Sequence, residues 1–359
     1  MTHAKLETLA RLRLRVGVLI DSSQSLEFTS YVHSGLASLA RAGAIDLAYR
    51  IARDRDERDL VRDPIILCLT LRRGTEPLAR LLACDFNDAN DYVSAAVAER
   101  CDAYFKRNYC RPALNRCDAR TLAKVAPLGF VFPCANVEAK MRVTRAIGPA
   151  LIGRGRDGLR ALRNFLALAP PDAWRQGPDH PVTQSVVFQT RLWANSEAPA
   201  REAAALNASR VDLVRALRDA FGERFVGGLM PTPLAQERFG ELISPHPSNR
   251  RLYMKMRKQQ LVGVCTAGLQ ESTPFKWAEC LATSQCIVAV PLRNELPVPV
   301  EAGRHYLPFT TPADCVDACR RLLADPRGAA AMRRENHEYF QAEVEPAARV
   351  ARLLLQAAA

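Results

Sequence analysis

Residues 261–291, LVGVCTAGLQESTPFKWAECLATSQCIVAVP, contain the pattern that decides the fold. The β-branched run at their start predicts a buried strand. A glycine turn connects it to a helix over 273–283, and residues 286–291 predict the next strand. Thr273 is expected to cap the helix, because its hydroxyl accepts from free backbone N–H groups, and Pro274 suits the first helical position. Strand, helix and strand in succession are typical of a parallel sheet.

The same alternation extends in both directions from this segment. Further strands are predicted over 14–21, 45–52, 64–71, 81–85, 103–107, 124–130, 185–192 and 224–229. Further helices are predicted over 25–41, 88–101, 201–221, 248–260, 312–323 and 349–356. Periodicity weakens between 134 and 181, where prolines and arginines collect. The predicted fold is therefore α/β, with two Rossmann-like doubly wound domains facing a cleft (1–180 and 181–335) and a helical tail (336–359).

Length and composition agree with this organisation. At roughly 100 to 200 residues per domain, 359 residues predict about two domains. The 48% hydrophobic content excludes a disordered chain. The eleven cysteines contain no C-x-x-C pair and are interpreted as buried free thiols. No apolar run is long enough for a membrane span or a secretory signal, so we expect a cytoplasmic protein.

The basic charge predicts an anionic partner. The net charge is +12, and the basic residues concentrate in segment 140–163, where Asp157 is the one acid, and in segment 250–258, which has none. Such segments suit an anionic membrane surface, which would make the protein peripheral at the inner membrane face. A solvated protein face is the alternative. Few aromatics separate the basic residues, so we expect no nucleic-acid partner.

Residues of the first segment resemble a known family. The N-terminus of helix 273–283 favours an anion such as a diphosphate, and Lys276 adds a positive charge in its first turn. Glu271 and Glu279 are separated by seven residues and follow the glycine turn at Gly268. This arrangement resembles the donor-site motif of GT-B glycosyltransferases. The resemblance covers about residues 185–345.

The resemblance implies a role for each motif residue. Glu279 would hold the donor ribose and Glu271 would lie near the donor sugar. Arg191, which ends the first strand of the second domain, would contact the diphosphate together with Lys276. The family often has a lysine shortly after this arginine, and the present sequence does not. Gly268 and Thr273 complete the expected donor-binding set. An exposed ion pair between Glu279 and Lys276 is the structural alternative.

In the N-terminal half, segments 102–108 and 124–130 also resemble bacterial members. Asp21 ends the first strand, His33 lies on the next helix, and Asp85, Asp88 and Asp91 follow another strand. One of these carboxylates or His33 would be the general base of an inverting enzyme, and a retaining enzyme would need none. A structural role is the alternative for His33. There is no zinc spacing, and the aspartate run Asp85, Asp88 and Asp91 resembles neither an EF-hand loop nor a metal-binding D-x-D motif. The expected reaction is therefore metal-independent, with a nucleotide sugar as substrate and no cofactor.

The function that this resemblance implies is transfer of a sugar from a nucleotide-sugar donor to a glycan or lipid-linked acceptor hydroxyl, in cell-envelope polysaccharide synthesis. Two other classes remain open. Residues 153–158, GRGRDG, match the dinucleotide fingerprint of a nicotinamide oxidoreductase, although no strand is predicted before them. The basic charge also suits a noncatalytic scaffold that binds polyanions.

Overall fold

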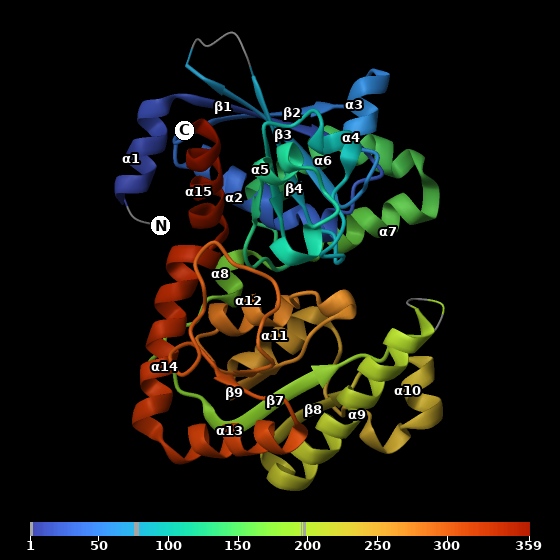
Figure 1. The fold of residues 1–359 in the computed structure, drawn as a ribbon, viewed down its shortest axis with the longest axis vertical. Helices are drawn as coiled ribbons and strands as arrows, with labels where there is room; N and C mark the ends of the chain where they lie inside the picture. Colours follow the sequence, from blue (N-terminus) through green and yellow to red (C-terminus); the bar gives the residue numbers. More distant parts are fainter. Residues whose placement is uncertain (1–2, 75–78, 195, 197–198) are drawn as a thin grey trace. The chain divides into compact units, whose positions relative to one another are not determined.

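The structure, a computed structural model, describes residues 3–74, 79–194, 196 and 199–359. The chain forms two compact units, whose elements are drawn in Figure 1. Unit 1 consists of Met1–Ala173, Asn294–Val298 and Gln341–Ala359, and unit 2 consists of Trp174–Arg293 and Pro299–Phe340. The predicted tail 336–359 is thus divided at Phe340, and its last part belongs to the first unit.

Unit 1 contains a six-stranded sheet in the order β2-β1-β3-β4-β5-β6. Its strands are β1 Leu14–Ile20, β2 Asp46–Ile51, β3 Ile66–Arg73, β4 Arg80–Asp85, β5 Ala103–Lys106 and β6 Val125–Pro127. β3 is antiparallel to both β1 and β4, whereas the other pairs are parallel. The expected parallel arrangement is therefore interrupted at β3. Its link to β4, residues 74–79, is shorter than a parallel crossover requires.

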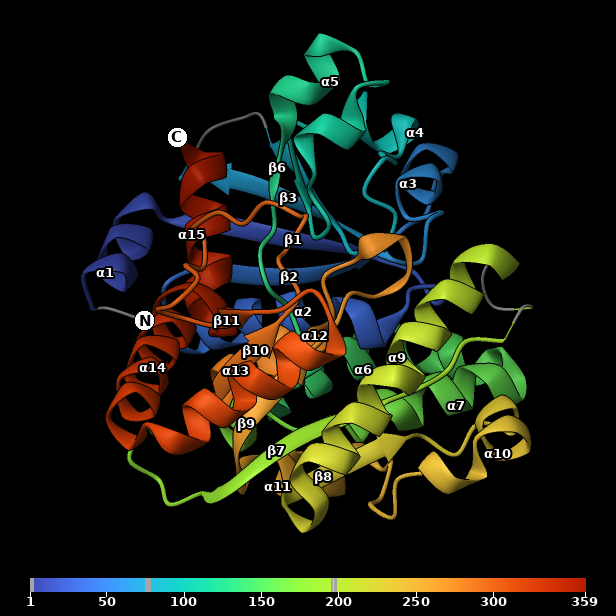
Figure 2. The same ribbon diagram turned by 60° about the horizontal axis from the view of Figure 1, so that its bottom comes forward.

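The helices of unit 1 differ from the sequence prediction in several places. They are α1 His3–Leu12, α2 Leu26–Arg41, α3 Arg55–Leu60, α4 Ala95–Ala98, α5 Ala119–Lys124, α6 Val137–Gly153, α7 Gly155–Leu166 and α15 Pro346–Ala358. The helix expected over 88–101 is only the short α4. The expected boundary region contains α6 and α7, which pack with α15 against the central helix α2 (Figure 2).

Unit 2 contains a five-stranded parallel sheet in the order β11-β10-β9-β7-β8. Its strands are β7 Thr183–Thr190, β8 Phe225–Leu229, β9 Gln260–Cys265, β10 Cys286–Ala289 and β11 Leu307–Pro308. The chain runs from β7 outward to β8 and then returns to β9 on the other side of β7. The strand order therefore reverses between β7 and β9, where doubly wound sheets bind ligands beyond the carboxyl ends of their strands.

The helices of unit 2 are α9 Ala200–Phe221, α10 Pro233–Arg238, α11 Arg250–Lys258, α12 Phe275–Ala282, α13 Pro312–Ala324 and α14 Pro326–Tyr339, while the short α8 Pro171–Trp174 spans the division between the units. Apolar residues of β7, β9 and β10 form the core with α9 and α13, which contact each other. No helix of the described residues is long and apolar enough to span a bilayer.

Candidate functional site

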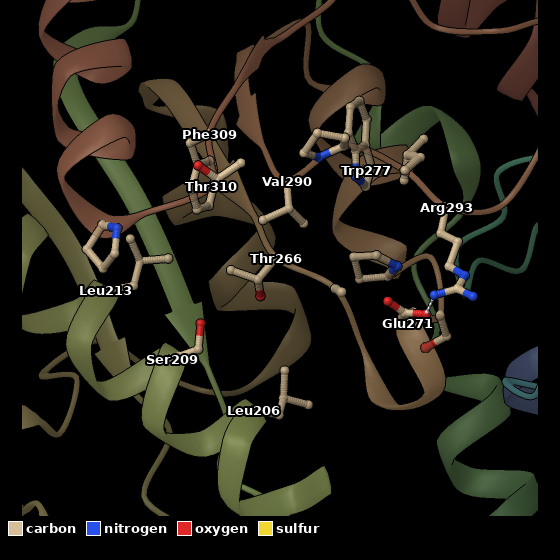
Figure 3. Close-up of a pocket in the computed structure, with 16 residues that line it drawn as sticks. Leu206, Ser209, Leu213, Thr266, Glu271, Trp277, Val290, Arg293, Phe309 and Thr310 are labelled. Carbon is tan, nitrogen blue, oxygen red and sulfur yellow. Dashed lines mark hydrogen bonds and ion pairs between the residues drawn. The ribbon is translucent and has the colours of Figure 1, made fainter.

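A pocket of about 240 Å³ lies at the carboxyl ends of β9, β10 and β11 in unit 2 (Figure 3). α9 contributes one wall, with Leu206, Ser209 and Leu213 facing the pocket. The remaining lining residues follow the three strands or belong to the loop and start of α12: Thr266, Ala267, Glu271, Ser272, Pro274, Trp277, Val290, Pro291, Leu292, Arg293, Phe309, Thr310 and Pro312. The pocket thus combines apolar walls with a few hydroxyl and charged groups, as small-molecule sites do.

Three basic side chains gather where the strand order reverses between β7 and β9. Arg191 follows β7, and its guanidinium lies 3.9 Å from the centre of the Trp193 ring. Arg210 of α9 is buried and donates to the carbonyls of Arg191 (2.8 Å) and Ala267 (3.2 Å), so it joins the ends of β7 and β9. Lys276 of α12 is partly buried against this cluster. Ala267 also lines the pocket, so the cluster and the pocket adjoin.

Two cations of the cluster, Arg210 and Lys276, form no ion pair among the described residues. Among the described residues, neither has an acidic side chain within 4 Å. The Lys276 Nζ lies 4.9 Å from the centre of the Phe188 ring. Burial, together with a smaller effect of the neighbouring Arg210, lowers the pKa of Lys276 to about 7. Burial and Arg191 lower the pKa of Arg210 to about 10. Mutually repelling cations at a strand-end crevice favour an anionic ligand.

The loop between β9 and α12 has an unusual backbone. Gln270 and Glu271 both have positive φ angles, 54° and 55°, which cost energy for residues with a Cβ. Gly268 approaches Ser272 so closely that a Cβ on it would lie 2.3 Å from the Ser272 Oγ. The carboxylate of Glu271 pairs with Arg293 at the edge of the pocket (Figure 3). Strained residues of this kind concentrate at ligand sites and switch regions.

The start of α12 corrects one expectation. The helix begins at Phe275, and its N-cap is Pro274, which has an extended ψ of 151°. Thr273 therefore lies one residue before the cap, although it had been expected to cap the helix. Because Thr273 precedes a proline, the helical region is sterically disfavoured for it. Thr273 itself is buried at the junction of loop and helix.

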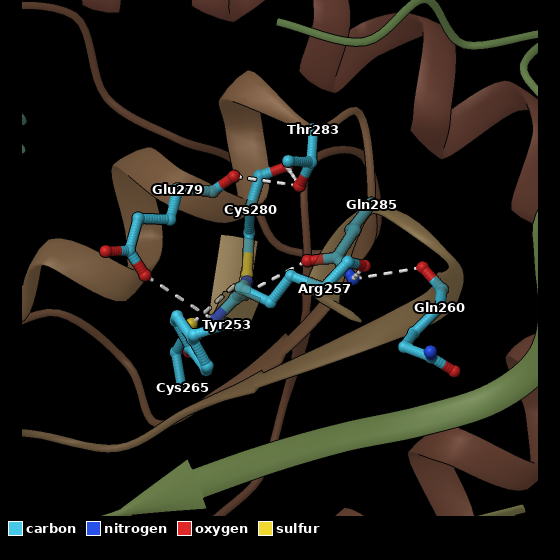
Figure 4. A network of polar contacts seen from close by, with 8 residues as sticks. All are labelled: Tyr253, Arg257, Gln260, Cys265, Glu279, Cys280, Thr283 and Gln285. Atoms are coloured by element: carbon cyan, nitrogen blue, oxygen red, sulfur yellow. Dashed lines mark hydrogen bonds and ion pairs between the residues drawn. The ribbon is translucent and has the colours of Figure 1, made fainter. Parts of the chain in front are cut away.

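Glu279 belongs to a buried network (Figure 4). Its Oε2 lies 3.7 Å from Nη1 of Arg257, which is 1% exposed and donates through Nη2 to Gln285 (3.0 Å) and Cys280 (2.5 Å). The other carboxylate oxygen of Glu279 points away from this network. The exposed ion pair with Lys276, which was the structural alternative, is therefore absent from the described residues. The cation close to Glu279 is instead the buried Arg257.

The acceptor-side candidates lie in unit 1. Asp21 follows β1, and its Oδ1 accepts from the N–H of Ser23 at 2.7 Å. His33 is fully buried on α2, where its Nδ1 lies 3.0 Å from the Tyr49 hydroxyl and the two rings stack. Its Nε2 has no partner among the described residues. Burial lowers the pKa of His33 to about 3, so the ring is neutral at physiological pH. This environment is typical of a structural histidine.

Replacing His33 with glutamine is expected to alter the pH dependence of stability. The pKa of His33 is lower in the folded chain than in the unfolded chain, so the unfolded chain binds the extra proton between pH 6.5 and about 3. Stability is therefore lost as the pH falls through this window, by about 1.4 kcal/mol per pH unit. Urea unfolding at several pH values should show a shallower slope in His33→Gln. The exposed control His180→Gln should keep the wild-type slope, and equal slopes in all three proteins would contradict the prediction.

Other carboxylates of unit 1 form structural pairs. Asp85 and Lys106 are both fully buried, 3.2 Å apart, and the Tyr104 hydroxyl donates to the same carboxylate oxygen. Asp88 accepts from Arg107 at 3.0 Å. The charge of Asp85, at the carboxyl end of β4, is thus compensated by Lys106.

The GRGRDG segment is a turn between two helices. Gly153 ends α6 and Gly155, with a φ of 67°, begins α7. Gly158 packs so closely on α6 that a Cβ on it would lie 1.8 Å from the Leu151 carbonyl oxygen. A dinucleotide fingerprint requires a preceding strand. Gly158 here serves helix packing and Gly155 serves the turn, which removes the support for a nicotinamide site.

Arg210 and Arg257 are functional candidates that were missed in the sequence. In α9, Arg210 is seven residues from both Ala203 and Leu217, which are buried, so it falls in the apolar stripe of the helix. An arginine within such a stripe was the available signal. Arg257 likewise follows the buried Met254 by three residues. Among the described residues, no three His, Cys, Asp or Glu side chains gather as a metal site requires.

Comparison with protein-family models and with curated proteins gives no match. Solved structures give matches at low identity. The C-terminal domain of a glycosyl transferase group 1 family protein from Francisella tularensis is 9% identical, with a TM-score of 0.35, and the match covers 45% of this chain and 87% of that chain. A putative UDP-N-acetylglucosamine 2-epimerase from Listeria monocytogenes is 10% identical, with a TM-score of 0.45 and 96% of each chain covered. A sucrose-phosphate synthase from Thermosynechococcus elongatus is 13% identical, with a TM-score of 0.38 and 91% and 92% covered.

Proposed function

We propose that this chain is a glycosyltransferase that binds a nucleotide-sugar donor in unit 2 and transfers the sugar to an acceptor hydroxyl. The observation that carries the proposal is the cluster of Arg191, Arg210 and Lys276 beside a pocket with apolar walls. A nucleoside diphosphate has the matching chemistry, because its base and ribose suit the pocket and its diphosphate suits the cations. The resemblance to the GT-B donor motif supports the same assignment.

The chemistry follows from this arrangement. Loss of the sugar leaves negative charge on the diphosphate, and fixed cations that meet this charge stabilise the transition state. Arg210 acts as a positioning residue, since it holds the backbone at Arg191 and Ala267 in place. Glu271 orients the sugar at the pocket edge once its pair with Arg293 opens, and the free oxygen of Glu279 faces the ribose. Asp21 is the candidate base on the acceptor side. The proposal includes no cofactor, and no step of it needs a metal.

The proposal extends to the acceptor and its location. We propose a glycan or lipid-linked glycan as acceptor, made available at the cytoplasmic face of an anionic membrane. The positive net charge of +12 supports this, because anionic lipid attracts basic protein surfaces.

Thermal unfolding with UDP, GDP, ADP, CMP and NAD tests the donor proposal. A ligand that binds the native protein raises the melting temperature, and at about a hundred times Kd it adds about 2.7 kcal/mol of stability. We expect a selective response to one nucleoside diphosphate and none to NAD. The matching nucleotide sugar should then lose its sugar only when an acceptor is present.

Three results would contradict the proposal. A response to NAD alone would indicate an oxidoreductase. Conversion of the sugar nucleotide without an acceptor would indicate an epimerase. No response to any nucleotide, combined with salt-sensitive binding to polyanions, would indicate a scaffold.

A further inference from the structure

The helical hairpin of α6 and α7 exposes an unusual share of apolar surface. Five of the eight large apolar side chains that are exposed in the described part of the chain lie on it, and each is between 44% and 70% exposed. They are Val137, Met141, Ile152, Leu159 and Leu166. Such a concentration within one hairpin marks an interaction surface, whereas isolated exposed apolar residues do not.

Arginines alternate with these apolar residues along the same helix faces. In α7, Leu159 and Leu166 are two turns apart, and the exposed Arg156 and Arg163 lie on the same face at three- and four-residue spacing. In α6, the exposed Arg145 follows Met141 by four residues. Arg154 and Arg160 add two further exposed cations. Each helix therefore presents apolar and cationic groups side by side.

Few acids offset this charge. Within the hairpin, Glu138 is paired with Arg142 at 2.6 Å, which leaves Asp157 as the exposed acid. The close contact at Gly158 fixes the two helices against each other. The hairpin is thus a preformed basic platform with apolar side chains projecting from it.

The second basic segment lacks this combination. In α11, Met254 and Met256 are buried in unit 2, and the exposed Arg251 has one exposed apolar neighbour, Leu252. Of its other cations, Lys255 is exposed and Arg257 lies in the buried network with Glu279. Charge alone did not distinguish the two segments in the sequence, whereas the exposure of apolar side chains does.

We infer that the α6–α7 hairpin docks on an anionic lipid membrane. Amphipathic helices with basic and apolar residues lie in the plane of the bilayer interface, where the apolar side chains enter the headgroup region and the cations meet anionic lipid. A nucleic acid would pair with the arginines, but it would not bury the five exposed apolar side chains. The inference rests on the proposed lipid-linked acceptor, and it names the surface that would bring the chain to it.

Sedimentation with lipid vesicles tests this inference on the full chain without nucleotide. We expect binding to vesicles of phosphatidylglycerol and phosphatidylcholine in equal parts, weaker binding as salt rises, and little binding to phosphatidylcholine alone. Replacing Arg156, Arg160 and Arg163 with glutamine should weaken binding about a hundredfold, since each basic residue contributes about fivefold. Replacing Met141, Ile152 and Leu159 with serine should weaken it about tenfold or more.

The matched control is the double variant Arg251→Gln, Leu252→Ser on α11, which should bind vesicles like the wild type. Equal weakening by this control would overturn the assignment to the hairpin. So would unchanged vesicle binding in both hairpin variants, or a dimer in light scattering that the serine variant abolishes. Nucleotide affinity is measured separately without vesicles. If nucleotide affinity survives while vesicle binding fails, the docking surface is wrong and the proposed donor site stands. If vesicle binding survives while no nucleotide binds, the donor site is wrong and the docking surface stands.

Discussion

Replacing Lys276 with methionine is expected to weaken binding of the nucleotide-sugar donor about a hundredfold. Lys276 is partly buried beside Arg210, and among the described residues no carboxylate forms an ion pair with it. In the complex its ammonium group would meet the donor diphosphate in a crevice of low dielectric, where a charge-assisted hydrogen bond is strong. Isothermal calorimetry with the donor found in the nucleotide panel measures the change in Kd.

The exposed Lys255 of α11 offers a matched control in the same unit. Lys255→Met removes the same charge and should leave Kd unchanged, because only a local contact with the diphosphate is at issue. Equal Kd values for Lys276→Met and the wild type would remove the main support for the donor site. A parallel loss in both variants would show that general charge attraction, and no specific contact, binds the nucleotide.

The affinity should also depend on pH through Lys276. In the free protein its pKa is about 7, and a bound diphosphate would raise it, so binding above pH 7 takes up a proton. Kd should therefore be constant below pH 7 and rise by about tenfold per pH unit above it. A nucleoside diphosphate sugar suits this test, because its phosphates remain ionised throughout. Lys276→Arg keeps a permanent charge and should give a Kd independent of pH; the same rise in this variant would assign it to another group.

Local patterns predicted most strands and helices correctly. The segment 261–291 folds as strand, turn, helix and strand, because the β-branched run, the glycine and the proline each favour one local conformation. α6 and α7 were missed since Pro149 and four glycines interrupt their periodicity, although packing on α2 keeps them helical. The reversal of β3 depends on how strands pair, which local patterns do not contain.

The candidate site was predictable in its residue types and less so in its contacts. Arg191 and Lys276 were expected as phosphate cations, and both lie where the strand order reverses. Arg210 bonds to the backbone at this point of the sheet. It is sixty-six residues before Lys276 in the chain, and only the fold brings the two residues together. Spacing on one helix left an ion pair between Lys276 and Glu279 as the structural alternative, but the cation beside Glu279 is Arg257 of α11. Contacts between distant elements were the part that the sequence could not supply.

The second large expected effect is on stability, and it concerns Arg257, the cation beside Glu279. Arg257→Met is expected to lower the free energy of unfolding by about 3 to 5 kcal/mol, because it leaves the buried Glu279 carboxylate without a cation and removes the bonds to Cys280 and Gln285. Urea unfolding measured by circular dichroism gives the value. Arg251→Met on the exposed face of the same helix is the control and should change stability by less than about 0.5 kcal/mol.

The double variant separates the structural role of Glu279 from its proposed role at the ribose. If Glu279 chiefly compensates Arg257, then Arg257→Met, Glu279→Gln should be more stable than Arg257→Met alone by about 1 to 3 kcal/mol, since no unpaired charge remains buried. The oxygen that points away from the network should still matter for the donor. Glu279→Gln alone should therefore weaken nucleotide binding about tenfold under conditions where the variant is fully folded. The reason is that an amide is the weaker acceptor for a ribose hydroxyl. A stable Arg257→Met protein would refute the structural half of this argument, and wild-type affinity in Glu279→Gln would refute the functional half.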